Sequence, residues 1–95
     1  MLQTIISAIE KNEVLSFTYE GQPREVEPHA VGVSTGGYKV LRCFQVNGHQ
    51  QHEHSWDLVP LSKIADLSTT KQKFDGTRSG YKSGDKGMTT IYAHV

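Results

Sequence analysis

The first apolar residues of the chain recur with the period of an α-helix. Positions i, i+3, i+4 and i+7 are occupied by Leu2, Ile5, Ile6 and Ile9. Residues with this spacing form one apolar stripe along a helix, and polar residues 10–12 end the pattern, so we predict a helix over residues 2–12. A helix this short is only marginally stable alone, and we therefore expect it to lie on a sheet.

Beyond residue 13 the apolar residues alternate with polar ones, which is the pattern of half-buried β-strands. Residues 14–19 show it most clearly. Similar segments, bounded by turn residues, predict further strands over residues 24–33, 38–46, 56–61 and 65–69, with a helical turn at residues 61–64. Pro28 interrupts the second strand. Because proline cannot donate a hydrogen bond to a sheet, we expect a β-bulge or a sheet edge there.

The segment 38–46 carries apolar groups on both of its faces. We therefore predict that it is the central strand and is covered on two sides. Arg42 lies in the middle of one face, between Tyr38 and Phe44. A cation in that position needs either a partner of opposite charge or a ligand.

After Phe74 the chain becomes rich in glycine and basic residues, and residues 88–95 then alternate in a way that could add a strand. We expect this C-terminal arm to be docked on the rest of the protein rather than free. The fold class predicted is mainly β. It consists of a small five-stranded barrel with an N-terminal helix over residues 1–74, followed by a basic, glycine-rich arm over residues 75–95.

Ninety-five residues suffice for one domain with a modest core. The formal net charge is zero, but its distribution is uneven. Residues 1–70 hold five Lys and Arg against eight Asp and Glu, whereas residues 71–95 hold five against two. A basic arm on a mildly acidic body indicates local anion binding or contact between the two parts, and a solvated tail is the alternative.

A single cysteine, Cys43, excludes an internal disulfide and fits a reducing compartment. No apolar run approaches the ~20 residues that span a bilayer, and the first residues lack the basic start and cleavage site of a signal peptide. We therefore expect a cytoplasmic protein that does not associate with membranes.

Several short motifs follow one another in a particular order. They are Leu15-x-Phe17-x-Tyr19, Arg24-x-Val26-Glu27-Pro28-His29-x-x-Gly32-Val33, Gly37-Tyr38-x-Val40, Trp56, and Leu61-Ser62-Lys63-Ile64. In the order and spacing of these motifs the chain resembles the WYL domain family, especially its short stand-alone members with an Sm-like, SH3-type β-barrel. The resemblance implies a bacterial or phage regulatory module that senses nucleic acid or nucleotide ligands.

The most specific site hypothesis is an anion-binding surface. The candidate ligand-binding residues, which a small barrel would bring together from three elements, are Arg24, His29, Tyr38, Arg42 and Lys63. Guanidinium groups bind phosphate bidentately, and tyrosine offers a ring for stacking. The alternative is that the two arginines form ordinary ion pairs with acidic residues of neighbouring strands, namely Glu25, Glu27 or Asp57.

The arm places basic and aromatic groups on a glycine-rich backbone, a combination suited to wrapping around a phosphodiester chain. Its candidate nucleic-acid-binding residues are Arg78, Tyr81, Lys82 and Lys86. A flexible or subunit-docking arm is the alternative.

We expect Trp56 to fill volume in the core or in an interface rather than to serve as a platform for a ligand.

His49, His52 and His54 gather in a polar loop, but their spacing matches no structural zinc pattern, so we predict neither a metal site nor a cofactor. No catalytic motif is present, and Cys43 is expected to be a buried apolar residue rather than a nucleophile. We therefore predict a protein that is not an enzyme.

Binding of nucleic acid or a nucleotide in a regulatory role is the first hypothesis for its function. One alternative is a protein–protein adaptor that forms a homo-oligomer through exposed strand edges. The other is sequestration of a small nucleotide signal, which requires a closed pocket between subunits.

Overall fold

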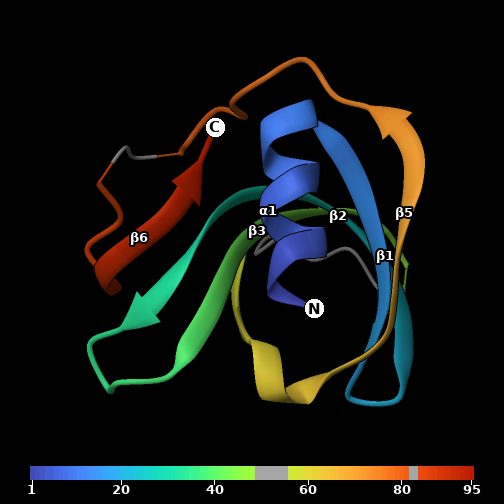
Figure 1. Ribbon diagram of the computed structural model, residues 1–95. Coiled ribbons are helices and arrows are strands. Elements are labelled where there is room, and N and C mark those ends of the chain that lie inside the picture. Colours follow the sequence, from blue (N-terminus) through green and yellow to red (C-terminus); the bar gives the residue numbers. More distant parts are fainter. Residues whose placement is uncertain (49–55, 82–83) are drawn as a thin grey trace.

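The computed structural model describes residues 1–48, 56–81 and 84–95 (Figure 1). It begins with helix α1, Leu2–Lys11, which confirms the predicted helix. Ile5, Ala8 and Ile9 form its buried face. The helix ends because Asn12 adopts a left-handed conformation with φ of 55° and donates its backbone N–H to carbonyl groups of the last turn.

Six antiparallel strands follow the helix. They are β1 (Glu13–Tyr19), β2 (Gln22–Ser34), β3 (Lys39–Gly48), β4 (Trp56–Pro60), β5 (Ile64–Lys73) and β6 (Met88–His94). A short 3-10 helix, η1 (Leu61–Lys63), joins β4 to β5 at the predicted helical turn. Residues 1–74 hold the five predicted strands, β1–β5, and the alternating segment at residues 88–95 adds the sixth, β6.

The strands form one sheet in the order β4-β3-β2-β1-β5, and β6 pairs with β2. Strand β2 is long enough to hold two neighbours on one edge. Its first half pairs with β1, its second half pairs with β6, and β3 runs along the opposite edge. Figure 1 shows the sheet curving around α1. The predicted closure into a barrel is not confirmed, because in the described ranges β4 and β5 stand at the two ends of the order and do not pair.

A β-bulge interrupts β2 where Pro28 indicated one. Pro28 pairs with Cys43 and Ala30 pairs with Arg42, which leaves His29 without a counterpart in β3. The bulge turns the ring of His29 toward the same side of the sheet as Ala30, where it meets Trp56. The extra residue therefore delivers a histidine to the face of the sheet that lies away from α1.

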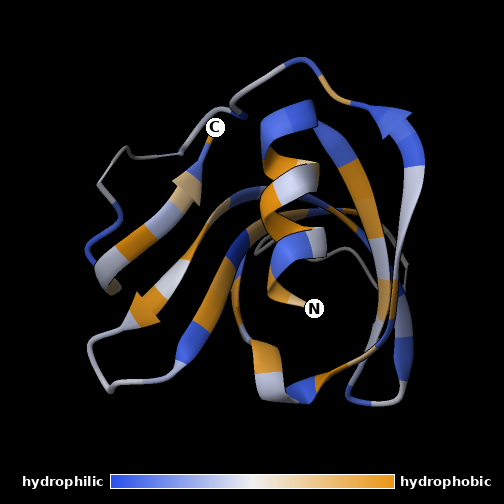
Figure 2. Ribbon diagram, in the orientation of Figure 1, coloured by the Kyte–Doolittle hydropathy of each residue, from blue (hydrophilic) through white to orange (hydrophobic). Residues whose placement is uncertain are grey.

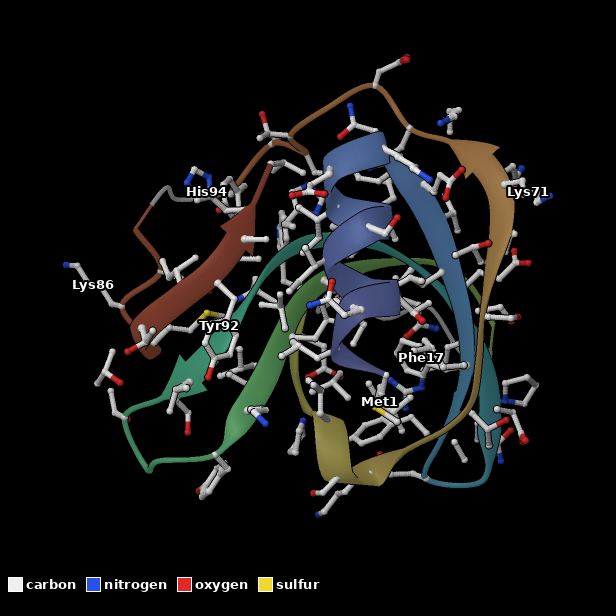
Figure 3. All side chains as sticks on the ribbon, in the orientation of Figure 1. Met1, Phe17, Lys71, Lys86, Tyr92 and His94 are labelled. Carbon is white, nitrogen blue, oxygen red and sulfur yellow. The ribbon has the colours of Figure 1, made fainter. Side chains whose placement is uncertain are left out.

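The two faces of the sheet have separate apolar clusters. On the inner face, the buried residues of α1 belong to one cluster with Leu15, Phe17, Leu41 and Cys43. Figure 2 shows the alternation of apolar and polar residues along the strands, and Figure 3 shows the ring of Phe17 within this interior. The outer face carries a smaller cluster of Ala30, Val40 and Met88, on which Leu58, Tyr81 and Ile91 pack. The prediction that β3 is covered on both sides is confirmed, but the prediction that it is the central strand is wrong, because β2 stands in the middle of the order and pairs with β1, β3 and β6.

The end of the arm lies very close to β2. A Cβ atom placed on Gly32 would stand 1.9 Å from the backbone oxygen of Thr90, so only glycine allows β6 to pack here. Segment 88–94 is therefore part of the sheet rather than an appendage.

In the described parts of the chain, no helix has the length and apolar character that a membrane crossing demands.

Candidate ligand-binding groove

The two arginines of the predicted anion-binding surface lie on opposite faces of the sheet. Arg24 belongs to the inner face, where its guanidinium stands 4.7 Å from the centre of the Tyr19 ring. It is 3.4 Å from a carboxylate oxygen of Asp57 and 3.6 Å from one of Glu20. The ion-pair alternative is therefore correct for Arg24, with Asp57 as one of its partners.

Arg42 belongs to the outer face and is paired with Asp85 from the arm. Its Nε atom donates to Oδ2 of Asp85 at 2.6 Å, and its Nη2 atom donates to Oδ1 at 3.1 Å. The Asp85 side chain is only 7% exposed. The cation on β3 thus has the partner it requires, although that partner is not one of the acids considered from the sequence.

The other three predicted residues do not join either arginine in a shared patch. His29 is fully buried, with 0% of its surface exposed. Tyr38 is 62% exposed in the turn between β2 and β3, and Lys63 is exposed on η1. The structure therefore does not bring Arg24, His29, Tyr38, Arg42 and Lys63 together as one cationic surface.

A cluster of aromatic rings covers the outer face instead. The centre of the His29 ring lies 4.8 Å from Trp56, 5.6 Å from Phe74 and 5.2 Å from Tyr81. Trp56 also meets Phe44 edge-on at 5.2 Å, and its ring lies 6.1 Å from that of Tyr81 at an interplanar angle of 28°. These rings come from β2, β3, β4, the residue after β5 and the arm, so the cluster joins the arm to the sheet.

The basic residues of the arm have different environments. Arg78 donates to both carboxylate oxygens of Glu27, at 2.7 and 3.1 Å, and its guanidinium lies 4.5 Å from the centre of the Phe44 ring. It is therefore held in an internal contact. Lys86 is exposed and extends away from the loop before β6 (Figure 3). Lys82 lies outside the described residues.

A groove with a volume of about 500 Å³ runs between the arm and the outer face. We call it the arm groove, and its lining residues are Arg42, Trp56, Gly80, Tyr81, Gly84, Asp85, Lys86 and Gly87. Gly80 adopts φ of +96°, and a Cβ atom on it would lie 3.0 Å from the indole nitrogen of Trp56. Glycine is required there both by the backbone conformation and by the approach of the indole.

The charges at one end of the arm groove are fixed. Hydrogen bonds from Arg42 and from the Gly87 N–H hold the pKa of Asp85 below its ordinary value, and the same bond to Asp85 raises the pKa of Arg42. Burial raises the pKa of Tyr81. The Tyr81 hydroxyl is buried and has no hydrogen-bond partner within the described part of the chain. The groove thus combines an ion pair, two aromatic walls and the exposed ammonium group of Lys86.

Cys43 is buried on the inner face, as predicted, and burial raises the pKa of its thiol. Within residues 1–48, 56–81 and 84–95, no group of three or more potential metal ligands is present. His49, His52 and His54, for which no metal site was predicted, lie outside these ranges.

Trp56 was expected to fill volume in the core or in an interface rather than to serve as a platform for a ligand. It packs against His29 and Phe44, and it also lines the arm groove.

Comparisons with protein family models, with curated proteins and with solved structures found no match. The likeness to the WYL domain family therefore stays an expectation from the sequence.

Proposed function

We propose that this protein is a non-catalytic binding module and that the arm groove takes a nucleotide. The observation that carries this proposal is the joint presence of Trp56, Tyr81, Arg42 and Lys86 around one groove of about 500 Å³. Aromatic rings bind nucleobases by stacking, and a nearby cation binds the phosphate group. The groove has the volume of an ordinary small-molecule site.

Each lining group has a distinct role in this proposal. A base stacks on the walls formed by Trp56 and Tyr81. Asp85 accepts hydrogen bonds from Nε and Nη2 of Arg42, and a guanidinium group has five N–H donors in all, so Arg42 can also donate to a polar edge of the ligand. Lys86, exposed at the rim, binds the phosphate.

The charge balance favours a small ligand over a long polyanion. Arg42 and Asp85 neutralise one another, so the described lining residues carry one net positive charge, that of Lys86. One phosphate contact predicts a weak dependence on salt, with log K falling by roughly 0.7 to 0.9 for each unit of log salt concentration. The charge of the described lining residues therefore favours a mononucleotide or one nucleotide within a single strand.

The strand order supports the finer description of the fold. A curved antiparallel sheet in the order β4-β3-β2-β1-β5, with a 3-10 turn before β5, is compatible with a small Sm-like, SH3-type barrel that is open between β4 and β5. Together with the likeness to the WYL domain family, this supports a regulatory role for the bound nucleotide. Cytoplasmic location and assembly as a homo-oligomer belong to the same proposal.

Calorimetric titration of the native protein with the four nucleoside monophosphates, a cyclic dinucleotide and a short oligothymidine tests the proposal. We expect saturable binding of at least one nucleotide, together with a change in the emission of Trp56, the single tryptophan of the chain. Stacking is worth about 1–3 kcal/mol per base, so Tyr81→Leu should weaken binding by roughly one order of magnitude. Lys86→Ala should weaken it to a similar extent by removing a charged hydrogen bond.

Two matched substitutions serve as controls. Tyr38→Leu changes an exposed tyrosine outside the groove, and Lys63→Ala removes an exposed lysine on η1. Neither should alter affinity. Binding that survives Tyr81→Leu but is lost in Lys63→Ala would place the site elsewhere, and absence of binding for every nucleotide would overturn the proposed function.

A further inference from the structure

His29 is a buried titratable residue at the junction between the sheet and the arm. It occupies the bulge of β2 and has 0% of its surface exposed. Its Nδ1 atom lies 2.9 Å from the backbone oxygen of Glu27, and its Nε2 atom lies 3.1 Å from the backbone nitrogen of Arg78. One imidazole ring therefore bonds to β2 on one side and to the arm on the other.

These two contacts allow only one protonation state. A carbonyl oxygen can only accept, so Nδ1 carries the hydrogen that is donated to Glu27. The backbone N–H of Arg78 can only donate, so Nε2 must be the bare, accepting nitrogen. The ring is thus the neutral tautomer, and a second proton could bind only at the position that the Arg78 N–H occupies.

We propose that His29 is a proton-sensitive latch: the neutral ring holds residues 74–81 on the outer face, and uptake of a proton at Nε2 releases them. Protonation of Nε2 replaces the hydrogen bond from the Arg78 N–H with a repulsion between two hydrogen atoms. It also places a positive charge on the buried imidazole, among the aromatic rings that surround it. Both effects favour separation of the segment from the sheet over protonation in place.

The groups that face His29 have opposing effects on its charge. Glu27, its neighbour on β2, attracts a proton, and the guanidinium of Arg78 in the arm opposes one. Tyr81 from the arm faces it as a titratable phenol, and Trp56 from β4 and Phe74 are uncharged rings. Burial has the largest influence and lowers the pKa of His29 below its ordinary value of 6.5.

The direction of the pH effect follows from this lowered pKa. In the released state His29 is exposed and titrates near pH 6.5, whereas in the latched state it titrates at a lower pH. The latched state is therefore fully favoured above pH 6.5 and loses stability as the pH falls toward the lowered pKa. Within that window the ratio of latched to released protein falls about tenfold for each pH unit.

The consequence for the ligand rests on the proposed function. Trp56 and Tyr81, two walls of the arm groove, both touch the ring of His29. Release of residues 74–81 removes Gly80 and Tyr81 from the groove. Acid should therefore weaken nucleotide binding, and the latch would make the module a pH-dependent binder.

Amide hydrogen exchange of the native protein, followed by NMR between pH 7.5 and pH 5, tests the latch without any ligand. The quantity measured is the protection factor, in which the intrinsic pH dependence of exchange is removed. We expect the Arg78 amide to lose protection as the pH falls below 6.5 while the amides of the β2–β3 ladder keep theirs. His29→Gln retains an accepting oxygen but does not titrate, and its Arg78 protection should not change with pH.

The matched control is His94→Gln, which removes an exposed histidine on β6 and should behave like the unmodified protein. Three outcomes would overturn the latch: Arg78 protection that does not change with pH, Arg78 protection that falls in step with the β2–β3 ladder, or an unaltered pH response in His29→Gln. If His29→Gln does not fold, the comparison of Arg78 with the ladder in the unmodified protein decides. Absence of nucleotide binding at pH 7.5 would overturn the proposed function and leave this measurement unaffected.

Discussion

Arg42 and Asp85 stand 43 positions apart in the sequence and are joined by two hydrogen bonds, of 2.6 and 3.1 Å. The first residue lies on strand β3, and the second lies in the loop before β6. The carboxylate also accepts a hydrogen bond from the Gly87 N–H at 2.8 Å, which shapes that loop. One largely buried acid therefore ties the arm to the sheet and completes one end of the arm groove.

Asp85→Asn should lower the free energy of unfolding by about 1.5–3 kcal/mol at pH 7, the usual range for hydrogen bonds to charged groups. The effect should depend on pH because the pKa of Asp85 is held below its ordinary value. The contribution of the pair is complete above the ordinary aspartate pKa of about 4 and is lost as the pH falls through the lowered value. Urea unfolding at pH 7 and at pH 3 should therefore show a smaller difference between variant and parent in acid.

A suitable control for this comparison is Asp75→Asn, because Asp75 is an exposed aspartate of the same arm. We expect it to change stability little at either pH. An equal loss for Asp85→Asn at both pH values would contradict the assignment of the pH dependence to this ion pair.

Gly32→Ala should displace β6 from β2, because the new Cβ atom would meet the backbone oxygen of Thr90 at 1.9 Å. We expect a loss of about 2 kcal/mol or more, together with faster hydrogen exchange along β6, since backbone cannot move aside as a flexible side chain can. Gly36→Ala is the matched control, because its Cβ atom meets only the end of the Tyr38 side chain. Similar stabilities for the two variants would show that β6 does not depend on this close approach.

Tyr81→Phe should leave the protein as stable as before or more stable by up to about 1 kcal/mol. The substitution removes a buried hydroxyl for which the described residues offer no hydrogen-bond partner, and it keeps the ring contacts with His29 and Trp56. Thermal and urea unfolding measure the difference, with Tyr38→Phe as the control at an exposed hydroxyl. A loss above about 1 kcal/mol would indicate that the Tyr81 hydroxyl is bonded after all.

Cys43 should resist thiol reagents in the native protein, because it is 1% exposed and burial raises the pKa of its thiol. We expect slow labelling with a disulfide reagent near neutral pH and complete labelling once urea unfolds the chain. Cys43 is the only cysteine, so one signal reports on this site. Rapid labelling of folded protein would mean that the inner face opens near β3.

The sequence patterns were sufficient to locate the elements of the fold. The stripe through Ile5 and Ile9 predicted α1, the alternation around Phe17 predicted β1, and Pro28 indicated the bulge. These features depend on neighbours in the chain, and local periodicity records them directly. The need of Arg42 for a partner was also correctly inferred from its place on an apolar face.

The partners themselves could not be predicted, because they depend on how distant segments meet. Asp85 stands between Gly84 and Lys86, in a segment that was considered for its basic and aromatic residues. No local pattern in the sequence indicates that Asp85 pairs with a residue of β3. The same is true of the pair between Glu27 and Arg78, which turned a candidate nucleic-acid contact into an internal one. Arg24 and Arg42 were predicted to lie on one surface, but the pairing register of β2 and β3 puts their side chains on opposite faces of the sheet.

The shared edge of β2 has a consequence for the order in which the protein assembles. The β1–β2–β3 meander joins neighbours in the chain, so it can form early and quickly. Strand β6 pairs with the same edge of β2 but comes from a distant part of the chain. It contributes Met88 and Ile91 to the apolar cluster of the outer face. During synthesis, the apolar residues of the outer face would therefore stay exposed to solvent until β6 had been made and had paired with β2, and in this interval the nascent chain would be most prone to aggregation.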